Sequence, residues 1–243
     1  STSLSALLPE WAHQGGKPAL LARLANGEAR QRMTADFKSA HPSRNLLWSA
    51  VLIGSSSRNR EYQGRRVDEL AAEAGKSPED WVLDALLEAE GHIDMIHFGM
   101  SEENRKAELR HPAMMIGTDG YGLPIDGPLT QGLPHPRSYG TFPRILGGYV
   151  REQGVITLEE AIWKMSGLPA LKLRWTDRGL IKEGYRADLV ILNPDTVIDH
   201  ATYQAPRQYP AGIHHVIVNG RLVIHDGVHT RALPGRVLSR PSH

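Results

Sequence analysis

Cysteine is absent from this chain of 243 residues. Its absence excludes a disulfide framework, a thiol nucleophile and a thiolate metal site, and it fits a reducing compartment. Long hydrophobic runs are missing too, since none approaches the ~20 apolar residues that a membrane-spanning helix needs. The first eight residues lack the basic start of a signal peptide. We therefore expect a soluble cytoplasmic protein.

An excess of charge of one sign is also lacking. The chain has 28 basic and 27 acidic residues, a net charge of +1, and no run of five like charges. No bulk field attracts nucleic acid or an acidic membrane, and we expect neither as a partner. Apolar residues make up 40% of the chain, enough for a substantial core in one or two domains.

Several motifs of known chemistry are missing as well. The sequence has no His-x-His, Ser-x-x-Lys or Gly-x-Ser-x-Gly, and the segment Gly54–Ser57 lacks the lysine of a phosphate-binding loop. His92 and His97 lie five residues apart on a predicted strand, so they point to opposite faces, and the adjacent His214 and His215 also diverge. The three protein ligands of a zinc site are therefore not predicted, and no metal site is complete in this chain.

Helical and extended patterns alternate along most of the chain. Residues 4–40 are helical in pattern, and from 45 to 167 predicted strands alternate with predicted helices. The alternation predicts an α/β fold with a parallel sheet, but it provides only three or four of the eight β/α units of a complete barrel. The end of the chain is all-β. The predicted strands are 45–54, 92–98, 113–117, 187–192, 213–220 and 221–225, and the predicted helices after residue 40 are 67–74, 77–89, 101–109, 142–153 and 157–166.

Asp119 follows the predicted strand 113–117 and precedes Gly120. In β/α folds, catalytic side chains lie at the carboxyl ends of strands, and a carboxylate there can move a proton between water and a leaving amine. Asp-Gly is also common turn chemistry, so spacing alone favours a simple turn.

A long loop rich in glycine and proline, residues 120–141, follows Asp119. Loops of this length inside compact domains are usually functional or disordered. The loop carries His135 and Arg137 on either side of a proline, and a guanidinium in a stiffened loop suits bidentate binding of a carboxylate. A solvated arginine in a surface loop is the alternative.

Six stretches give the chain a likeness to a known family. They are 1–11 (STSLSALLPEW), 111–120 (HPAMMIGTDG), 134–146 (PHPRSYGTFPRIL), 158–170 (LEEAIWKMSGLPA), 177–190 (DRGLIKEGYRADLV) and 212–220 (GIHHVIVNG). With them the chain resembles the N-acyl-D-amino-acid deacylases, or D-aminoacylases, of the amidohydrolase superfamily. The last three stretches are typical of the superfamily, and HPRSYGTF is the narrower signal.

The resemblance implies the C-terminal part of a metal-dependent (β/α)8 barrel, followed by strands of a small β-sandwich. We expect a partial barrel over 1–175, with a helical insertion near 9–40, and the β-sandwich segment over 176–243. The resemblance makes Asp119 the general acid/base beside zinc, with Arg137, His135 and Ser3 as substrate-binding residues. Thr118 departs from the serine that is more frequent in the family.

The larger departure is the absence of the family's metal ligands, which precede the matched region. We therefore expect the N-terminal half of the enzyme as a separate or cleaved chain, and we expect this chain alone to be inactive. The expected reaction is zinc-dependent hydrolysis of an N-acyl-D-amino acid. The alternatives are a cyclic-amide hydrolase similar to dihydroorotase or hydantoinase, and an inactive fragment or scaffold subunit without metal ligands.

Overall fold

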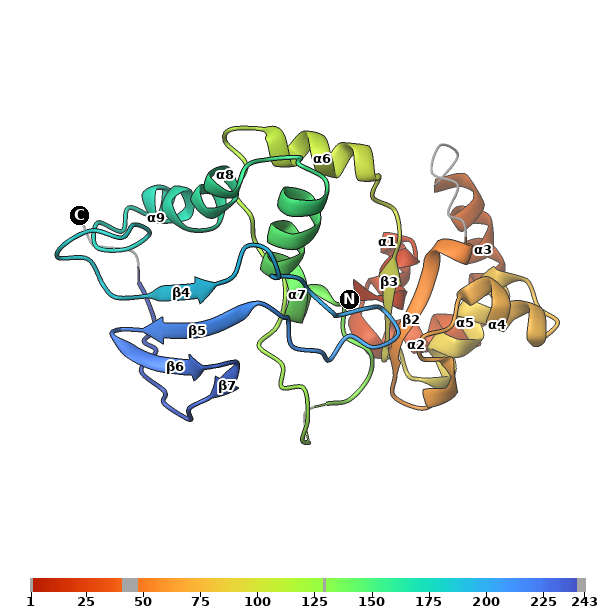
Figure 1. Cartoon of the computed structure of the whole chain (residues 1–243). Coiled ribbons are helices and arrows are strands. Elements are labelled where there is room, and N and C mark those ends of the chain that lie inside the picture. Colours follow the sequence, from red (N-terminus) through yellow and green to blue (C-terminus); the bar gives the residue numbers. More distant parts are fainter. Residues whose placement is uncertain (1, 41–47, 129, 240–243) are drawn as a thin grey trace. The chain divides into compact units, whose positions relative to one another are not determined.

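The computed structural model describes residues 2–40, 48–128 and 130–239, and the chain forms two compact units (Figure 1). Unit 1 consists of Ser1–Gly99, Asp126–His135 and Tyr203–Ala205. Unit 2 consists of Met100–Ile125, Pro136–Thr202 and Pro206–His243. Within the described ranges, no helix combines the length and the apolar character needed to cross a membrane. The division predicted between residues 175 and 176 stays a prediction.

Helices make up most of unit 1, and local signals set their ends. α4 (Val67–Glu73) is followed by Gly75, whose φ of +64° suits the residue after a helix. α5 (Pro78–Glu88) begins after Ser77, whose Oγ accepts the N–H of Asp80 at 3.1 Å. Both helices and the helical character of residues 4–40 are confirmed. The remaining helical elements of the unit are η1 (Leu4–Leu7), α1 (Glu10–His13), α2 (Gly16–Ala25), α3 (Gly27–Ala40), η2 (Trp48–Ala50) and η3 (Arg60–Tyr62).

The sheet of unit 1 has the order β1-β3-β2. β1 (Thr2–Ser3) and β2 (Val51–Ser56) both pair antiparallel with β3 (Ile93–His97). The strands predicted near 45–54 and 92–98 are therefore present, although residues 45–47 lie outside the described residues. The parallel pairing expected from the alternation is wrong for this sheet, because α4 and α5 return the chain beside β2 in the opposite direction.

The core of unit 1 joins its sheet to its helices. Val51, Ile53 and Ile93 of the strands are buried together with Leu83 and Leu86 of α5. Each of these side chains contributes about 1.5–3 kcal/mol relative to an exposed one. The apolar run that begins at Val51 is continuous because β2 is buried along its whole length except at Ser55.

Unit 2 contains two long helical runs. In the first, α7 (Arg137–Arg144) continues as the π-helical segment η4 (Ile145–Glu152) and ends before Gly154, which has a φ of +58°. In the second, the capping box of Thr157 and Glu160 opens α8 (Leu158–Ile162), as predicted. That run continues through the π-helical η5 (Trp163–Gly167) to α9 (Leu168–Leu173). α6 (Glu102–Arg110) starts at the predicted cap Ser101, whose Oγ accepts the N–H of Asn104.

Two predictions for unit 2 are wrong. The helix expected from Phe142 begins at Arg137, because Pro136 opens it by accepting the N–H groups of Tyr139 and Gly140. The early start of the helix could not be predicted from the sequence, because glycine and proline, here Gly140 and Pro143, usually interrupt helices. The strand expected over 113–117 does not form. The N–H of Ile116 there donates to a helical carbonyl, that of Lys164, and none of the described strands pairs with the segment.

The sheet of unit 2 is antiparallel, in the order β4-β5-β6-β7. Its strands are β4 (Leu189–Leu192), β5 (Ile213–Val218), β6 (Arg221–His225) and β7 (Val228–His229). The predicted turn Asn219–Gly220 joins β5 to β6 with positive φ at both residues, as a type I′ hairpin requires.

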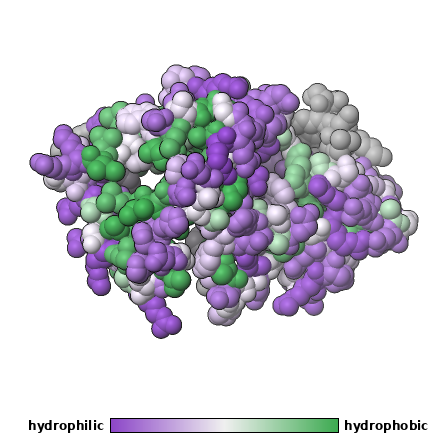
Figure 2. Space-filling model, in the orientation of Figure 1, coloured by the Kyte–Doolittle hydropathy of each residue, from purple (hydrophilic) through white to green (hydrophobic). Residues whose placement is uncertain are grey.

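Apolar side chains remain exposed on this sheet. Val190 and Ile191, adjacent on the edge strand β4, are 55% and 49% exposed. Successive side chains of a strand point to opposite faces, so both faces of β4 are open to solvent. Figure 2 shows hydrophobic residues gathered over the part of the molecule that carries β4 and β5.

Candidate functional site

The segment that leads to Asp119 is held by Lys164 of η5. Lys164 is only 3% exposed, and its Nζ donates to the carbonyl oxygens of His111 at 2.5 Å and Met114 at 3.4 Å. Its own carbonyl accepts the N–H of Ile116 at 3.1 Å. A buried ammonium must be satisfied by such acceptors. Lys164 therefore replaces the missing β-ladder as the anchor of residues 111–116.

The turn that carries Asp119 then packs against the start of α7. A Cβ added to Gly120 would lie 2.8 Å from the Cα of Ser138, so only glycine allows this approach. The N–H of Tyr121 donates to Ser138 Oγ at 3.3 Å, and the N–H of Gly120 donates to Thr118 Oγ1 at 3.3 Å. Asp119 itself has a φ of +45°, a conformation that aspartate tolerates better than most residues.

This packing places Asp119 beside Arg137, the first residue of α7. Arg137 Nη2 lies 2.9 Å from Asp119 Oδ2. The side chain of Asp119 is 84% exposed and that of Arg137 is 31% exposed. The structure thus brings together two residues predicted for the site, but Arg137 belongs to a helix and not to a stiffened loop. The positive end of the helix dipole also favours a carboxylate at this position.

The helix that bears Arg137 is fixed by contacts within unit 2. Arg144 Nε and Nη2 bind Asp199 Oδ2 at 3.0 and 2.9 Å, and the Asp199 side chain is 5% exposed. Gly140 packs on the same carboxylate, since an added Cβ would lie 2.7 Å from Asp199 Cβ. The Tyr139 hydroxyl donates to Pro124 O at 3.2 Å, and burial raises the pKa of Tyr139 above its ordinary value. These contacts fix the position of α7 within unit 2, and therefore the position of Arg137 in the ion pair with Asp119.

The other two predicted site residues, His135 and Ser3, belong to unit 1. His135 Nε2 lies 3.4 Å from the Tyr203 hydroxyl, and the two rings meet edge to face with centroids 5.2 Å apart. Tyr203 also packs on Phe98 at 4.6 Å. Ser3 Oγ accepts the N–H of Ser5 at 3.3 Å and thereby caps the short helix η1. Each side chain thus has a local structural role in unit 1.

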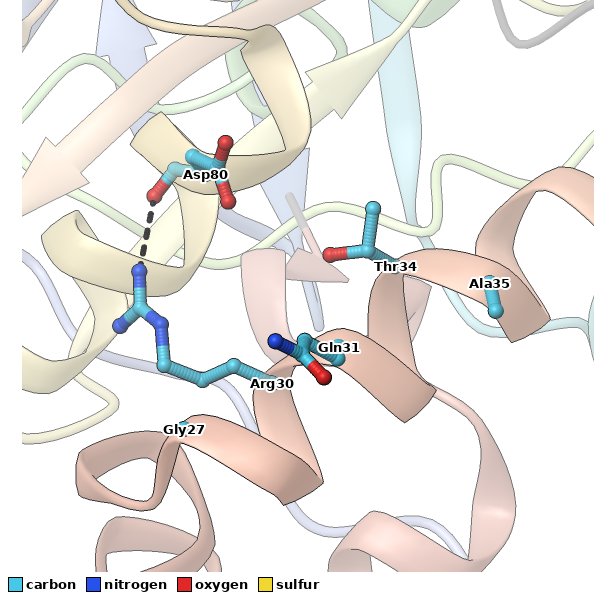
Figure 3. A pocket seen from close by; sticks show the side chains of 6 residues that line it. All are labelled: Gly27, Arg30, Gln31, Thr34, Ala35 and Asp80. Carbon is cyan, nitrogen blue, oxygen red and sulfur yellow. Dashed lines mark hydrogen bonds between the residues drawn. The ribbon is translucent and has the colours of Figure 1, made fainter.

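Unit 1 has a surface pocket with a volume of about 480 Å³. Figure 3 shows Arg30 of α3 reaching across it to the backbone oxygen of Asp80, at 3.5 Å. The same Nη2 binds Asp84 Oδ1 at 2.6 Å, so the guanidinium joins α3 to α5. None of the predicted site residues lines this pocket, whose lining consists of Gly27, Arg30, Gln31, Thr34, Ala35 and Asp80.

Asp119 does not complete a metal site with the residues around it. Within 2–40, 48–128 and 130–239, the one group of three potential metal ligands consists of His215, His225 and Asp226. The partner of Asp119 is a cation, Arg137, which disfavours a metal ion at the same carboxylate. Sequence spacing missed this histidine group, and it also missed Lys164 and Asp199. Lys164 and Asp199 contact residues that lie 53 and 55 positions away in the chain, and the two histidines meet through the pairing of β5 with β6.

Comparisons with known proteins agree on one group. The sequence model described as "Amidohydrolase family" matches residues 6–224. Two proteins of Alcaligenes xylosoxydans xylosoxydans are similar. A D-aminoacylase is 45% identical over 74% of this chain and 35% of its own length, and an N-acyl-D-aspartate deacylase is 39% identical over 93% and 45%. The chain thus spans less than half the length of the relatives it matches.

Solved structures show the same likeness. The crystal structure of a D-aminoacylase matches with a TM-score of 0.70 and 42% identity, over 80% of this chain and 39% of that one. An N-acyl-D-glutamate deacylase from Bordetella bronchiseptica, in complex with zinc and a phosphonate inhibitor, matches with a TM-score of 0.64 and 34% identity. It covers 73% of this chain and 35% of the other. A further D-aminoacylase structure concerns a binuclear metal centre.

Proposed function

This chain belongs to the amidohydrolase family, and we propose that it forms the Asp119-bearing part of an enzyme that hydrolyses N-acyl-D-amino acids. Its fold class is the predicted one, part of an amidohydrolase α/β fold with a separate antiparallel sheet. One observation carries the proposal. An exposed carboxylate lies 2.9 Å from a guanidinium at the start of a fixed helix, in a chain similar to deacylases of N-acyl-D-amino acids.

In this proposal, Asp119 moves the proton of the reaction. Water adds to the amide carbonyl carbon, the C–N bond breaks, and the proton taken from water passes to the departing amine nitrogen. The products are a carboxylate and the free amino acid. A carboxylate that is 84% exposed can receive the proton and return it, and such general acid/base catalysis is worth about 10²–10⁴-fold in rate.

Arg137 is proposed to bind the α-carboxylate of the substrate. A guanidinium has five N–H donors, and Asp119 Oδ2 lies next to one of its nitrogens, Nη2. A substrate carboxylate beside Arg137 would place its own amide close to Asp119. His135 and Ser3 are proposed to add hydrogen bonds to the substrate, as the family resemblance implies.

Metal ions are proposed to be held by residues outside this chain, because the side chains described around Asp119 do not form a ligand set. The metal-bound relatives support a metal, and the zinc complex among them supports zinc. We propose that the ligands come from the N-terminal half of the enzyme, as a separate or cleaved chain. The exposed apolar side chains of β4 are consistent with such a partner.

The decisive experiment is a chromatographic assay of free amino acid released from N-acetyl-D-amino acids by the preparation that contains this chain. Asp119→Asn removes the proton acceptor at constant size and should lower kcat by about 10²–10⁴-fold. Asp195→Asn changes an exposed aspartate elsewhere in unit 2 and should leave kcat unchanged. Full activity in Asp119→Asn would refute the role of this carboxylate.

Three further measurements address the partner and the alternatives. Mass spectrometry should find a second polypeptide beside the 26.9 kDa chain, and a folded, active monomer of 26.9 kDa alone would exclude it. Hydrolysis of dihydroorotate or hydantoins, without hydrolysis of N-acyl-D-amino acids, would instead identify a cyclic-amide hydrolase. A preparation that contains both polypeptides and has neither activity would identify an inactive scaffold.

A further inference from the structure

Two histidines and an aspartate meet on the sheet of unit 2, apart from the Asp119–Arg137 pair. His215 lies on β5, His225 ends β6, and Asp226 follows in the turn to β7. Their potential ligand atoms all lie within 4.8 Å of one another. His215 Nε2 is 3.6 Å from Asp226 Oδ1, and His225 Nε2 is 3.5 Å from Asp226 Oδ2.

The register of the sheet produces this group. Val216 of β5 pairs with Ile224 of β6, so the next residues outward, His215 and His225, face each other across the two strands. Their ring centroids are 5.2 Å apart, with a tilt of 30° between the planes. The two imidazoles are held by a backbone ladder and not by a mobile loop.

The turn after β6 positions the carboxylate. Asp226 and Gly227 have φ values of +47° and +77°, so they form a tight turn. The N–H of Gly227 donates to the carbonyl of His214 at 3.1 Å, which fixes the turn against β5. Asp226 consequently turns its carboxylate toward both imidazoles.

The chemistry of the three groups suits a transition-metal ion. Imidazole nitrogen and carboxylate oxygen bind Zn²⁺ at about 2.0–2.2 Å, which separates tetrahedral ligands by about 3.4 Å. The two nitrogen–oxygen distances of 3.5 and 3.6 Å, each to a different carboxylate oxygen of Asp226, are close to that value. The side chains of His215, His225 and Asp226 are 26%, 60% and 73% exposed, so an ion can reach the three ligand atoms from solvent.

We propose that His215, His225 and Asp226 bind one divalent transition-metal ion, Zn²⁺ in the first place, with water in the remaining position. Two imidazoles select such ions over Mg²⁺ and Ca²⁺, which prefer oxygen ligands. The bound ion would join β5 to the β6–β7 turn and stabilise the sheet of unit 2. This site is independent of the proposed deacylase activity, because Asp119 is not among its ligands.

Binding changes one hydrogen bond. The N–H of Asp226 donates to His215 Nδ1 at 3.3 Å, which places the ring proton of the neutral imidazole on Nε2. Coordination through Nε2 requires the other tautomer, with the proton on Nδ1. Two N–H groups would then face each other, so this long hydrogen bond is given up and the His215 ring turns away from the N–H of Asp226. The loss of one long hydrogen bond is small beside coordination of a metal ion by three side chains.

Isothermal titration calorimetry tests the proposal. The full chain, without a histidine tag and freed of metal by dialysis against a chelator, is titrated with ZnCl₂. Wild type should bind one Zn²⁺ in the group, whereas His225→Ala and Asp226→Asn should weaken that binding by about tenfold or more. Asparagine also tolerates positive φ, so Asp226→Asn keeps the turn and removes the charge.

The matched control is His229→Ala. His229 is an exposed histidine on β7 of the same sheet, but it pairs with Ile224 and so lies one residue out of step with His225. The affinity of the His229→Ala variant for Zn²⁺ should stay within about twofold of the wild-type affinity. Co²⁺ provides a second readout, since tetrahedral coordination gives strong visible absorption bands that both ligand variants should lose.

Two results would overturn the proposal. One is a wild-type chain that binds neither Zn²⁺ nor Co²⁺. The other is a His225→Ala or Asp226→Asn variant that binds Zn²⁺ as tightly as the His229→Ala control. Circular dichroism of each variant identifies any loss of fold, and the conservative Asp226→Asn variant decides the question if His225→Ala does not fold.

Discussion

Gly120 should be the glycine of unit 2 whose replacement by alanine most directly disturbs the candidate site. The added Cβ would lie 2.8 Å from Ser138 Cα and 3.2 Å from Arg137 O, against the 3.4–4.0 Å of an ordinary contact. The nearest atom is backbone, so the Asp119 turn must move away from α7 by roughly 1 Å. Overpacking of this kind costs about 1–3 kcal/mol. The same shift would lengthen the 2.9 Å contact of Asp119 with Arg137.

Gly117→Ala is the matched control, three residues earlier in the same segment. Nothing lies within 4 Å of the Cβ that it adds, and its φ is not positive. There alanine mainly restricts the unfolded chain and should stabilise the fold by about 0.4–1 kcal/mol. The effect on the unfolded chain is common to both changes, so urea unfolding should place Gly120→Ala about 1–3 kcal/mol below Gly117→Ala. Equal unfolding free energies for the two variants would refute the close packing of the turn on α7.

Two further predictions concern buried or paired charges. Lys164→Met leaves two carbonyls without their donor and should lower the unfolding free energy in urea by about 2 kcal/mol. The control Lys172→Met changes an exposed lysine near the end of the same helical run and should alter the unfolding free energy by less than about 0.5 kcal/mol. A small effect at Lys164 would contradict its anchoring role. Burial raises the pKa of Asp84, but hydrogen bonds from Lys76 and Arg30 outweigh burial and leave the pKa below its ordinary value. Its stabilisation is therefore complete above the unfolded pKa of about 3.9 and is lost as pH falls through the folded value. With Asp84 39% exposed, Asp84→Asn should cost about 1 kcal/mol at pH 7 and progressively less as the pH falls below the unfolded pKa of about 3.9; a cost independent of pH would contradict the ion pair.

Local signals predicted the limits of many elements. Ser77 and Ser101 place an oxygen at the start of a helix where an N–H group lacks a partner, and the capping box at Thr157 does so reciprocally. The Asn219–Gly220 hairpin follows from the positive φ that its two residues tolerate. In each case the interaction lies within four residues along the chain, so the sequence contains all of it.

Interactions between distant segments could not be predicted in this way. Residues 113–117 have the composition of a strand, but the carbonyl and ammonium of Lys164, some fifty positions away, take their backbone hydrogen bonds. Arg137 was expected in a loop because a glycine such as Gly140 usually interrupts a helix. Only the close packing of Gly140 on Asp199 explains why a glycine stands inside α7. The same holds for His215 and His225, which meet through strand register.

The exposure of the Asp119–Arg137 pair has a direct consequence for the proposed reaction. An ion pair at the surface is worth only about 0–1 kcal/mol, because water screens the attraction and both side chains lose freedom. Arg137 can therefore exchange part of its contact with Asp119 for a substrate carboxylate at little cost in free energy. A buried pair would resist the exchange, since removing one partner from a buried ion pair costs about 3–5 kcal/mol. In this chain by itself, the solvent exposure of 84% at Asp119 thus favours one arrangement, in which the pair holds both residues in place until the substrate arrives and then separates.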